Sequence, residues 1–233
     1  SLSQFVQQWS DAAGEVVLCH SDLLTKHFSN LAIARSWYQP FSALGVELFF
    51  IVSGYVIAMR VGEKDTGGAF FAARVLRLLP MYWFFTSLVV LVYLVKPAWH
   101  LMGFSPDPIN MAKSFLILPQ QGFPILGVGW TLEHEILFYL GVALMLATVG
   151  SGRGARIGLA WLLTALGAVG LALGWPAGPV PGASTLGAAF LTHVFNPFML
   201  AFALGWLVRE LEGRRAADLA LQVLPPALIL LWA

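Results

Sequence analysis

The sequence predicts an all-α polytopic membrane protein, and three observations support that fold class. Only 11% of the 233 residues are Asp, Glu, Lys or Arg, less than half of the share of about 25% found in soluble domains. Hydrophobic residues make up 58% of the chain, and the mean hydropathy is +0.77. The apolar residues also come in unbroken runs rather than in alternation, which is typical of spanning helices.

The composition excludes several other classes of protein. The apolar content is too high for an intrinsically disordered chain, and Cys19 is the single cysteine, so a disulfide scaffold is excluded. A formal net charge of +1 argues against a nucleic-acid partner. We expect no metal site, because the five histidines lack a two-His helical spacing and a nearby Cys cluster.

Stretches with few or no charged residues place about seven transmembrane helices, at about 20 residues per crossing. A Gly- and Pro-rich stretch at 174–185 separates two of them, because this composition is typical of a loop. The expected spans are 12–24, 41–59, 78–95, 136–152, 157–174, 187–208 and an incomplete one at 219–233. The chain lacks an initiator Met and ends inside the last span, so we expect a single truncated transmembrane domain over 1–233 whose C-terminal spans are missing.

The stretch 114–132 also lacks charged residues, but it contains two Pro, two Gln and three Gly. This composition predicts a re-entrant or interfacial segment near 114–130, because irregular backbone at membrane depth must be satisfied by protein or water. If 98–130 stays on one side of the membrane, nine of the thirteen Lys and Arg residues lie on the opposite side. The positive-inside rule then predicts a cytoplasmic 60–77 loop in a multi-pass membrane protein.

Ionisable residues within the expected spans are candidates for function, since a charge at mid-bilayer costs at least about 2.5–3.5 kcal/mol on insertion scales. Glu15 and His20 lie in the first span and Glu47 in the second. Glu135 lies at the start of the span at 136–152, and His193 is a weaker fifth candidate.

Each of the stronger candidates has two interpretations. His20 can take up and return a proton near neutral pH, or it can tie two helices together as a buried neutral histidine. Glu47 needs a partner from another helix, or it is a helix-start carboxylate favoured by the helix dipole. Glu135 lies among apolar residues, or it is an interfacial carboxylate. Thr131 is expected to cap this helix, with Glu133 as a solvated acid in its first turn.

Two arginines precede the span at 78–95. Arg74 and Arg77 are three residues apart, so they share one helix face, and two guanidinium groups at that spacing can bind a phosphate bidentately. The alternative is that they are topology signals and anchors for lipid headgroups at the cytoplasmic end of a span.

Several segments together resemble the acyltransferase-3 family of integral membrane O-acyltransferases, near its exopolysaccharide-acetylating branch. The segments that carry the resemblance are His20 after an apolar run, GVELFFIVSGYVI at 45–57, RVLRLLPMYWFFT at 74–86 and WTLEHEILFY at 130–139. Their order and spacing match as well as their content. Beyond residue 157 the resemblance is only that of generic apolar helices.

The resemblance implies an enzyme that uses cytoplasmic acyl-CoA, usually acetyl-CoA, to acylate a hydroxyl of a sugar or another envelope or small-molecule acceptor. It implies catalytic roles for His20, Glu47 and Glu135, and it places Arg74 and Arg77 at the donor side. The chemistry is coherent, because acyl transfer from an activated thioester requires a base for the acceptor hydroxyl. His20 can be this base, or it can carry the acyl group transiently. A carboxylate would orient the imidazole, and backbone N–H groups near 127–131 could stabilise the oxyanion.

Two other functions remain open at this point. Intramembrane His and Glu residues also mark the proton relays of transporters and channel subunits. One broken segment without a counterpart counts against that alternative, since transporters often have broken helices in both halves. A non-catalytic membrane scaffold is the third possibility, and it would make His20 and Glu135 dispensable.

Cysteine labelling tests the predicted topology in a protein whose Cys19 has been replaced by Ser. A cysteine introduced by Asp107→Cys should react with an impermeant maleimide added outside intact cells, because 98–130 is predicted to lie on the outer side. A cysteine introduced by Asp65→Cys should stay unlabelled, because it lies in the predicted cytoplasmic loop. The reverse pattern would overturn the predicted orientation.

Overall fold

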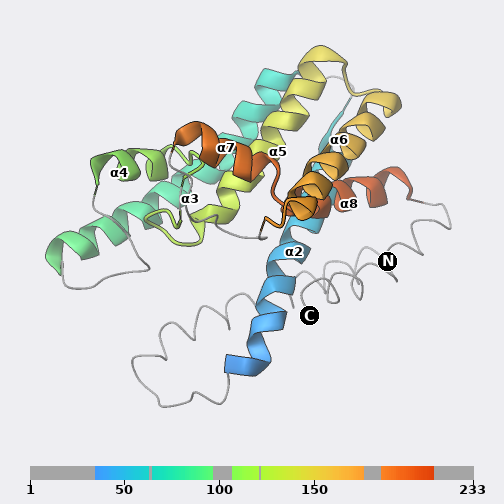
Figure 1. The fold of residues 1–233 in the computed structure, drawn as a ribbon. Coiled ribbons are helices and arrows are strands. Elements are labelled where there is room, and N and C mark those ends of the chain that lie inside the picture. Colours follow the sequence, from blue (N-terminus) through green and yellow to red (C-terminus); the bar gives the residue numbers. More distant parts are fainter. Residues whose placement is uncertain (1–34, 63–64, 97–106, 121, 176–184, 213–233) are drawn as a thin grey trace. The chain divides into compact units, whose positions relative to one another are not determined.

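A computed structural model gives the structure of the chain and describes residues 35–62, 65–96, 107–120, 122–175 and 185–212 (Figure 1). These residues form helices and no strands, which confirms the predicted all-α class. The helices are α2 (Arg35–Arg60), α3 (Gly67–Val95), α4 (Pro108–Phe115), α5 (Gly129–Thr148), α6 (Arg153–Ala172), α7 (Leu186–Val194) and α8 (Phe198–Glu210).

Three of the described helices, α3, α5 and α6, are long and apolar enough to cross a membrane. The pair α7 and α8, bent by 40°, would be a fourth crossing if the two helices form one span. The predicted span at 41–59 lies within α2, whereas those at 12–24 and 219–233 fall outside the described residues. The total of seven spans therefore remains a prediction.

The chain divides into two compact units, residues 1–60 with 201–233 and residues 61–200. In the first unit, α2 and the part of α8 from residue 201 onward cross at two glycines. A methyl group on Gly54 would collide with the carbonyl oxygen of Phe202, and one on Gly205 with that of Ile51. The absence of side chains thus lets the two backbones touch, as small residues do in membrane helix pairs. The rings of Phe50 and Phe202 pack beside this crossing at 4.7 Å.

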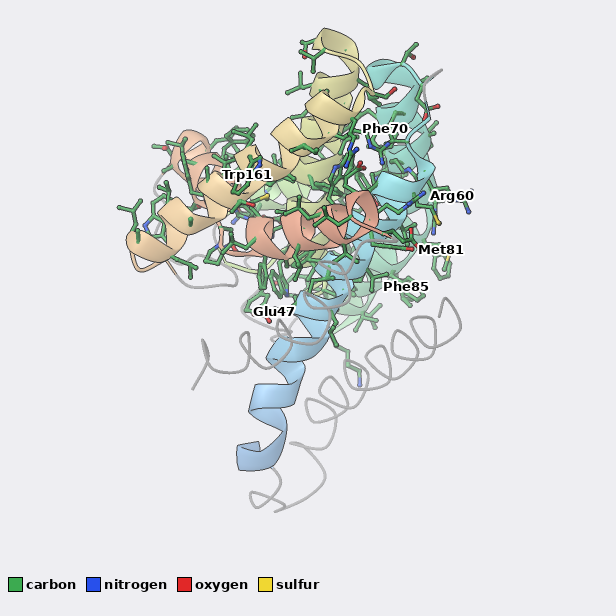
Figure 2. The ribbon with its side chains drawn as sticks, turned by 90° about the vertical axis from the view of Figure 1, so that its right-hand side faces the viewer. Glu47, Arg60, Phe70, Met81, Phe85 and Trp161 are labelled. Atoms are coloured by element: carbon green, nitrogen blue, oxygen red, sulfur yellow. The ribbon has the colours of Figure 1, made fainter. Side chains whose placement is uncertain are left out.

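In the second unit, α5 is the helix that α3, α6 and α7 all contact (Figure 1). Phe138 and Val142 of α5 are fully buried, and Leu159 and Leu163 of α6 are nearly so. The outer surfaces of α3 and α6 expose large apolar side chains, among them Met81, Phe85 and Trp161, all labelled in Figure 2. Such exposed apolar surfaces suit helices that face lipid.

The predicted interruption near 114–130 is present. The helix α4 ends at Phe115 and α5 begins at Gly129, and the described residues between them have irregular backbone. Ile117 adopts φ 50° and Gly122 adopts φ 70°, both in the left-handed region that reverses chain direction. This segment, 116–128, is called the irregular segment below.

The prediction of one continuous helix over 187–208 is wrong, because the chain breaks between α7 and α8. Pro197 lacks an N–H and disfavours helical backbone at Asn196, which explains the position of the break. The Asn196 side chain then accepts a hydrogen bond from the N–H of Phe198 at 3.1 Å and so satisfies the start of α8. The break lies against α6, where a methyl group on Gly170 would collide with the carbonyl oxygen of Phe195.

Candidate active site

Two buried carboxylates lie on opposite sides of α5. Glu133 and Glu135 are two residues apart, which separates them by about 200° around a helix. Glu133 is 1% exposed and Glu135 is 5% exposed. Glu135 lies on the side of α5 that packs on α3, whereas Glu133 lies on the side that meets α7 and the irregular segment.

On the α3 side, Glu135 is held by its own helix. Tyr139 lies one turn further along α5 and donates its hydroxyl to Oε1 of Glu135. The Tyr139 ring packs edge-on against Phe70 of α3, with ring centres 6.3 Å apart. Both partners are buried, so this hydrogen bond is shielded from competing solvent.

The same place receives the two arginines of α3. The guanidinium group of Arg74 lies over the Phe70 ring, 5.4 Å from its centre, in a cation–π contact. Arg74 and Arg77 both lie within electrostatic range of the Tyr139 hydroxyl. Arg74 is half-buried and Arg77 is exposed. Three residues predicted from two separate motifs, Arg74, Arg77 and Glu135, are therefore brought together by the packing of α3 on α5.

The chemistry of this cluster is that of an anion site beside a carboxylate. Two guanidinium groups on one helix face can bind a phosphate through charge-assisted, bidentate hydrogen bonds. A carboxylate fixed by a phenol hydroxyl can orient and stabilise a protonated base that approaches it. Within the described part of the chain, no three His, Cys, Asp or Glu side chains come together in a group that could hold a metal ion.

The other two predicted site residues, Glu47 and His20, do not belong to the described part of the second unit. Glu47 lies on α2 of the first unit and is buried, at 6% exposure (Figure 2). Glu135 belongs to the second unit. His20 lies outside the described residues. The roles of Glu47 and His20 therefore remain predictions.

The prediction that Glu133 is a solvated first-turn acid is wrong. Its Oε2 atom lies 2.9 Å from Nε2 of His193 in α7, and its Oε1 atom accepts a hydrogen bond of 3.1 Å from the side chain of Gln120. The reason is that Glu133 lies on the face of α5 that α7 covers, so its carboxylate meets protein instead of water. His193, predicted as a weaker candidate, is 1% exposed.

The predicted cap at Thr131 is also wrong. The helix starts earlier, at Gly129, and this glycine packs so closely on α3 that an added Cβ would lie 2.8 Å from the Tyr82 ring. Val128 precedes the helix without a side-chain cap, and the Thr131 hydroxyl donates to the Val128 carbonyl oxygen at 2.8 Å.

This early start also changes the predicted oxyanion site. The backbone N–H groups of Gly129, Trp130 and Thr131 already donate to carbonyl oxygens three residues earlier, at 2.7, 3.4 and 3.3 Å. These three groups are therefore occupied, and the expectation that they stabilise an oxyanion is wrong for them.

Sequence reasoning missed two partners. The spacing of four residues between Glu135 and Tyr139 could have indicated their hydrogen bond, since side chains at that spacing are neighbours on a helix. No comparable signal links Glu133 to His193, because sixty residues separate them and only the tertiary fold brings them together.

Comparison with known proteins shows the family to which the chain belongs. The profile of a family described as an acyltransferase domain matches residues 12–233. The chain is 31% identical over 108 residues to a Rhizobium meliloti (strain 1021) protein named "Exopolysaccharide production protein ExoZ". The alignment covers 42% of this chain but only 32% of that relative. No solved structure matches the chain significantly.

The bond between Tyr139 and Glu135 can be tested by a double-mutant cycle. Tyr139→Phe keeps the ring against Phe70 but removes the donor, so it should lower the free energy of unfolding by about 1.5–3 kcal/mol, the range for hydrogen bonds to charged groups. The loss should be much smaller when Glu135→Leu is already present, because a leucine offers no acceptor to the Tyr139 hydroxyl. Thermal or denaturant unfolding of the purified protein in detergent measures both values.

Thr148→Val is the matched control for this cycle. Thr148 lies on the same helix, is exposed, and its hydroxyl donates only to the Leu144 carbonyl oxygen of α5. Its removal should change stability by no more than about 0.5 kcal/mol. Equal effects of Tyr139→Phe and Thr148→Val would contradict the assigned bond.

Proposed function

Because the chain belongs to the acyltransferase family whose profile matches residues 12–233, we propose that the protein is a membrane O-acyltransferase acting in exopolysaccharide modification. It moves an acyl group, acetyl in the first instance, from cytoplasmic acyl-CoA to a sugar hydroxyl of an exopolysaccharide or another envelope glycan. It does so as a multi-pass protein of about seven spans in a bacterial inner membrane. The name of the Rhizobium meliloti relative supports the choice of acceptor class.

The observation that carries this proposal is the meeting of two distant motifs. The segment at 74–86 and the segment at 130–139 come together where α3 packs on α5, with Arg74 over Phe70 and Phe70 against Tyr139. The cluster therefore offers two cations and one oriented carboxylate within one contact between helices. A transferase that uses a phosphate-bearing donor and a protonated base needs these two kinds of group.

In the proposed reaction, the oxygen of the acceptor hydroxyl attacks the thioester carbonyl carbon of acyl-CoA. His20 takes the hydroxyl proton, the C–S bond breaks, and the proton passes to the departing thiolate of coenzyme A. A base of this kind contributes typically about 10²- to 10⁴-fold to the rate. Glu47 or Glu135 orients the imidazole and stabilises its protonated form.

One structural observation favours the alternative that the protein is a transporter. Within the described residues the chain has two interruptions, the irregular segment and the break between α7 and α8. Two interruptions are compatible with a transporter, since broken helices in both halves are typical of such proteins. An assay of group transfer separates a transporter or a scaffold from a transferase.

The function is tested by incubating the full-length protein in membranes with radiolabelled acetyl-CoA and a carbohydrate acceptor. We expect transfer of label to the glycan by the wild type and a loss of about 10²- to 10⁴-fold in His20→Gln, which keeps hydrogen bonding but lacks a base. His20→Ala should be equally inactive at normal expression. Acceptor labelling that persists in His20→Gln would mean that the base lies elsewhere, and no labelling by the wild type would refute the transferase.

The donor site is tested by the KM for acyl-CoA. Losing one charge-assisted hydrogen bond, worth about 1.5–3 kcal/mol, should raise this KM by about 10- to 150-fold in Arg77→Ala. Arg77→Lys should recover only part of the affinity, because the ammonium keeps the charge but loses the bidentate fork. Lysine would substitute fully if the arginines were only topology signals, which count Lys and Arg alike. Wild-type KM values in both variants would refute the donor site.

A further inference from the structure

We propose that Glu133 and His193 are a positioning pair that holds the irregular segment and α7 on α5, and thereby fixes the start of the helix that carries Glu135. That the pair holds the irregular segment and α7 on α5 is inferred from the hydrogen-bond geometry alone. Its effect on acyl transfer rests on the proposed function. Glu133 lies in the segment at 130–139 but was expected to be a solvated acid, and His193 was only a weaker candidate, so neither was assigned a role in the predicted site.

One carboxylate forms three hydrogen bonds from two directions. Oε2 of Glu133 lies 2.9 Å from Nε2 of His193 and accepts the backbone N–H of Gln120 at 3.4 Å, while Oε1 accepts the Gln120 side-chain amide at 3.1 Å. Glu133 and His193 are each 1% exposed and Gln120 is 4% exposed. A buried carboxylate is tolerated only when it is paired and hydrogen-bonded, so α7 and the irregular segment must both stay in place.

A second link fixes the other end of the irregular segment. The hydroxyl oxygen of Ser114, in α4, accepts the Gln120 side-chain amide at 3.2 Å and the N–H of Ile125 at 3.1 Å. The Tyr82 hydroxyl of α3 donates to the Ser114 carbonyl oxygen at 2.9 Å. Between these ties Ile117, a β-branched residue, is held at φ 50° and 2% exposed. Such a residue keeps a left-handed conformation only where its surroundings fix it.

The hydrogen bonds also fix the number of protons in the pair. Nδ1 of His193 lies 2.7 Å from the carbonyl oxygen of Ala189, which can only accept, so Nδ1 carries a hydrogen. The backbone N–H of Gln120 can only donate to Glu133. The contact between His193 and Glu133 therefore contains one proton, whether the pair is imidazolium and carboxylate or imidazole and carboxylic acid. Both forms have no net charge, which suits an apolar interior.

The ring of His134 packs against this pair and supports it. The His134 and His193 ring centres are 4.5 Å apart at an angle of 31°. Nδ1 of His134 lies 2.9 Å from the carbonyl oxygen of Trp130, so it donates within its own helix. His193 is thus held by its own helix on one side, by Glu133 on another, and by an aromatic face.

The pair controls Glu135 through the first turns of α5. The helix starts at Gly129 without a side-chain cap, so its first turns depend on tertiary contacts. Glu133 is the residue of these turns that holds both the preceding segment and α7. Glu135 follows two residues later, and small displacements of an orienting carboxylate lower the rate strongly. Removing the hydrogen bonds of Glu133 should therefore impair acyl transfer without altering Arg74 and Arg77 of α3.

The experiment combines amide hydrogen exchange with kinetics of the full-length protein in lipid nanodiscs. Glu133→Leu removes all three hydrogen bonds, while Glu133→Gln keeps those to the His193 ring and to the Gln120 side chain. His193→Phe keeps an aromatic ring beside His134 but loses the bond to Glu133. Thr192→Val is the matched control on the same helix, since the Thr192 hydroxyl donates only to the Ala189 carbonyl oxygen of α7.

We expect exchange in 116–132 to be at least about 10-fold faster in Glu133→Leu and His193→Phe, because local opening governs exchange. The kcat for acyl transfer should fall by about 10- to 100-fold, while the KM for acyl-CoA stays within about twofold of wild type. Glu133→Gln should give an intermediate result, and Thr192→Val should match the wild type. A general loss of packing would instead raise exchange in all helices and alter the donor KM as well.

The pair does not hold the irregular segment if exchange in 116–132 is the same in Glu133→Leu as in the wild type. His193→Phe provides the same test if Glu133→Leu cannot be purified in folded form. Faster exchange with unchanged kcat would refute the positioning role. If the wild-type protein transfers no acyl group, the proposed function fails, and the exchange data still decide whether Glu133 and His193 hold the segment.

Discussion

A carboxylate in an apolar interior must have hydrogen-bond partners. Helix α5 is buried and carries two such carboxylates, Glu133 and Glu135, on opposite faces. Each face of α5 therefore has to provide, or to meet, groups that donate hydrogen bonds to its carboxylate. Tyr139 and the arginine-bearing helix α3 lie on one face. His193 of α7 and Gln120 of the irregular segment meet the other. The arrangement around α5 in the second unit follows from this requirement as much as from the packing of apolar side chains.

The two faces differ in character, which suggests a division of labour in the proposed transferase. On the α3 face, a half-buried and an exposed arginine remain accessible next to a fixed carboxylate. On the α7 face, the side chains of Glu133, His193 and Gln120 are buried and hydrogen-bonded to one another, so that face holds structure in place. A helix of this kind can present a reactive group on one side because it is anchored on the other.

The sequence was informative where a local pattern carried the physics. The scarcity of charge predicted the all-α membrane class, and the spacing of Arg74 and Arg77 predicted their common face. The sequence was misleading where a contact between residues far apart in the chain determined the local structure. Glu133 reads as a first-turn acid because nothing near it in sequence reveals the helix that covers it. No local pattern encodes the start of α5 at Gly129 or the fit of that glycine against Tyr82.

The break between α7 and α8 has a consequence for how such a sequence can vary. Pro197 creates the break, and Gly170 of α6 leaves room for the carbonyl oxygen of Phe195 beside it. Gly167, one turn earlier, similarly makes room for Leu200. A larger residue at either glycine would collide with Phe195 or Leu200 and so demands a different path for the chain near 195–200. These positions therefore form a single unit of variation, in which a change to one is tolerated only together with changes to the others.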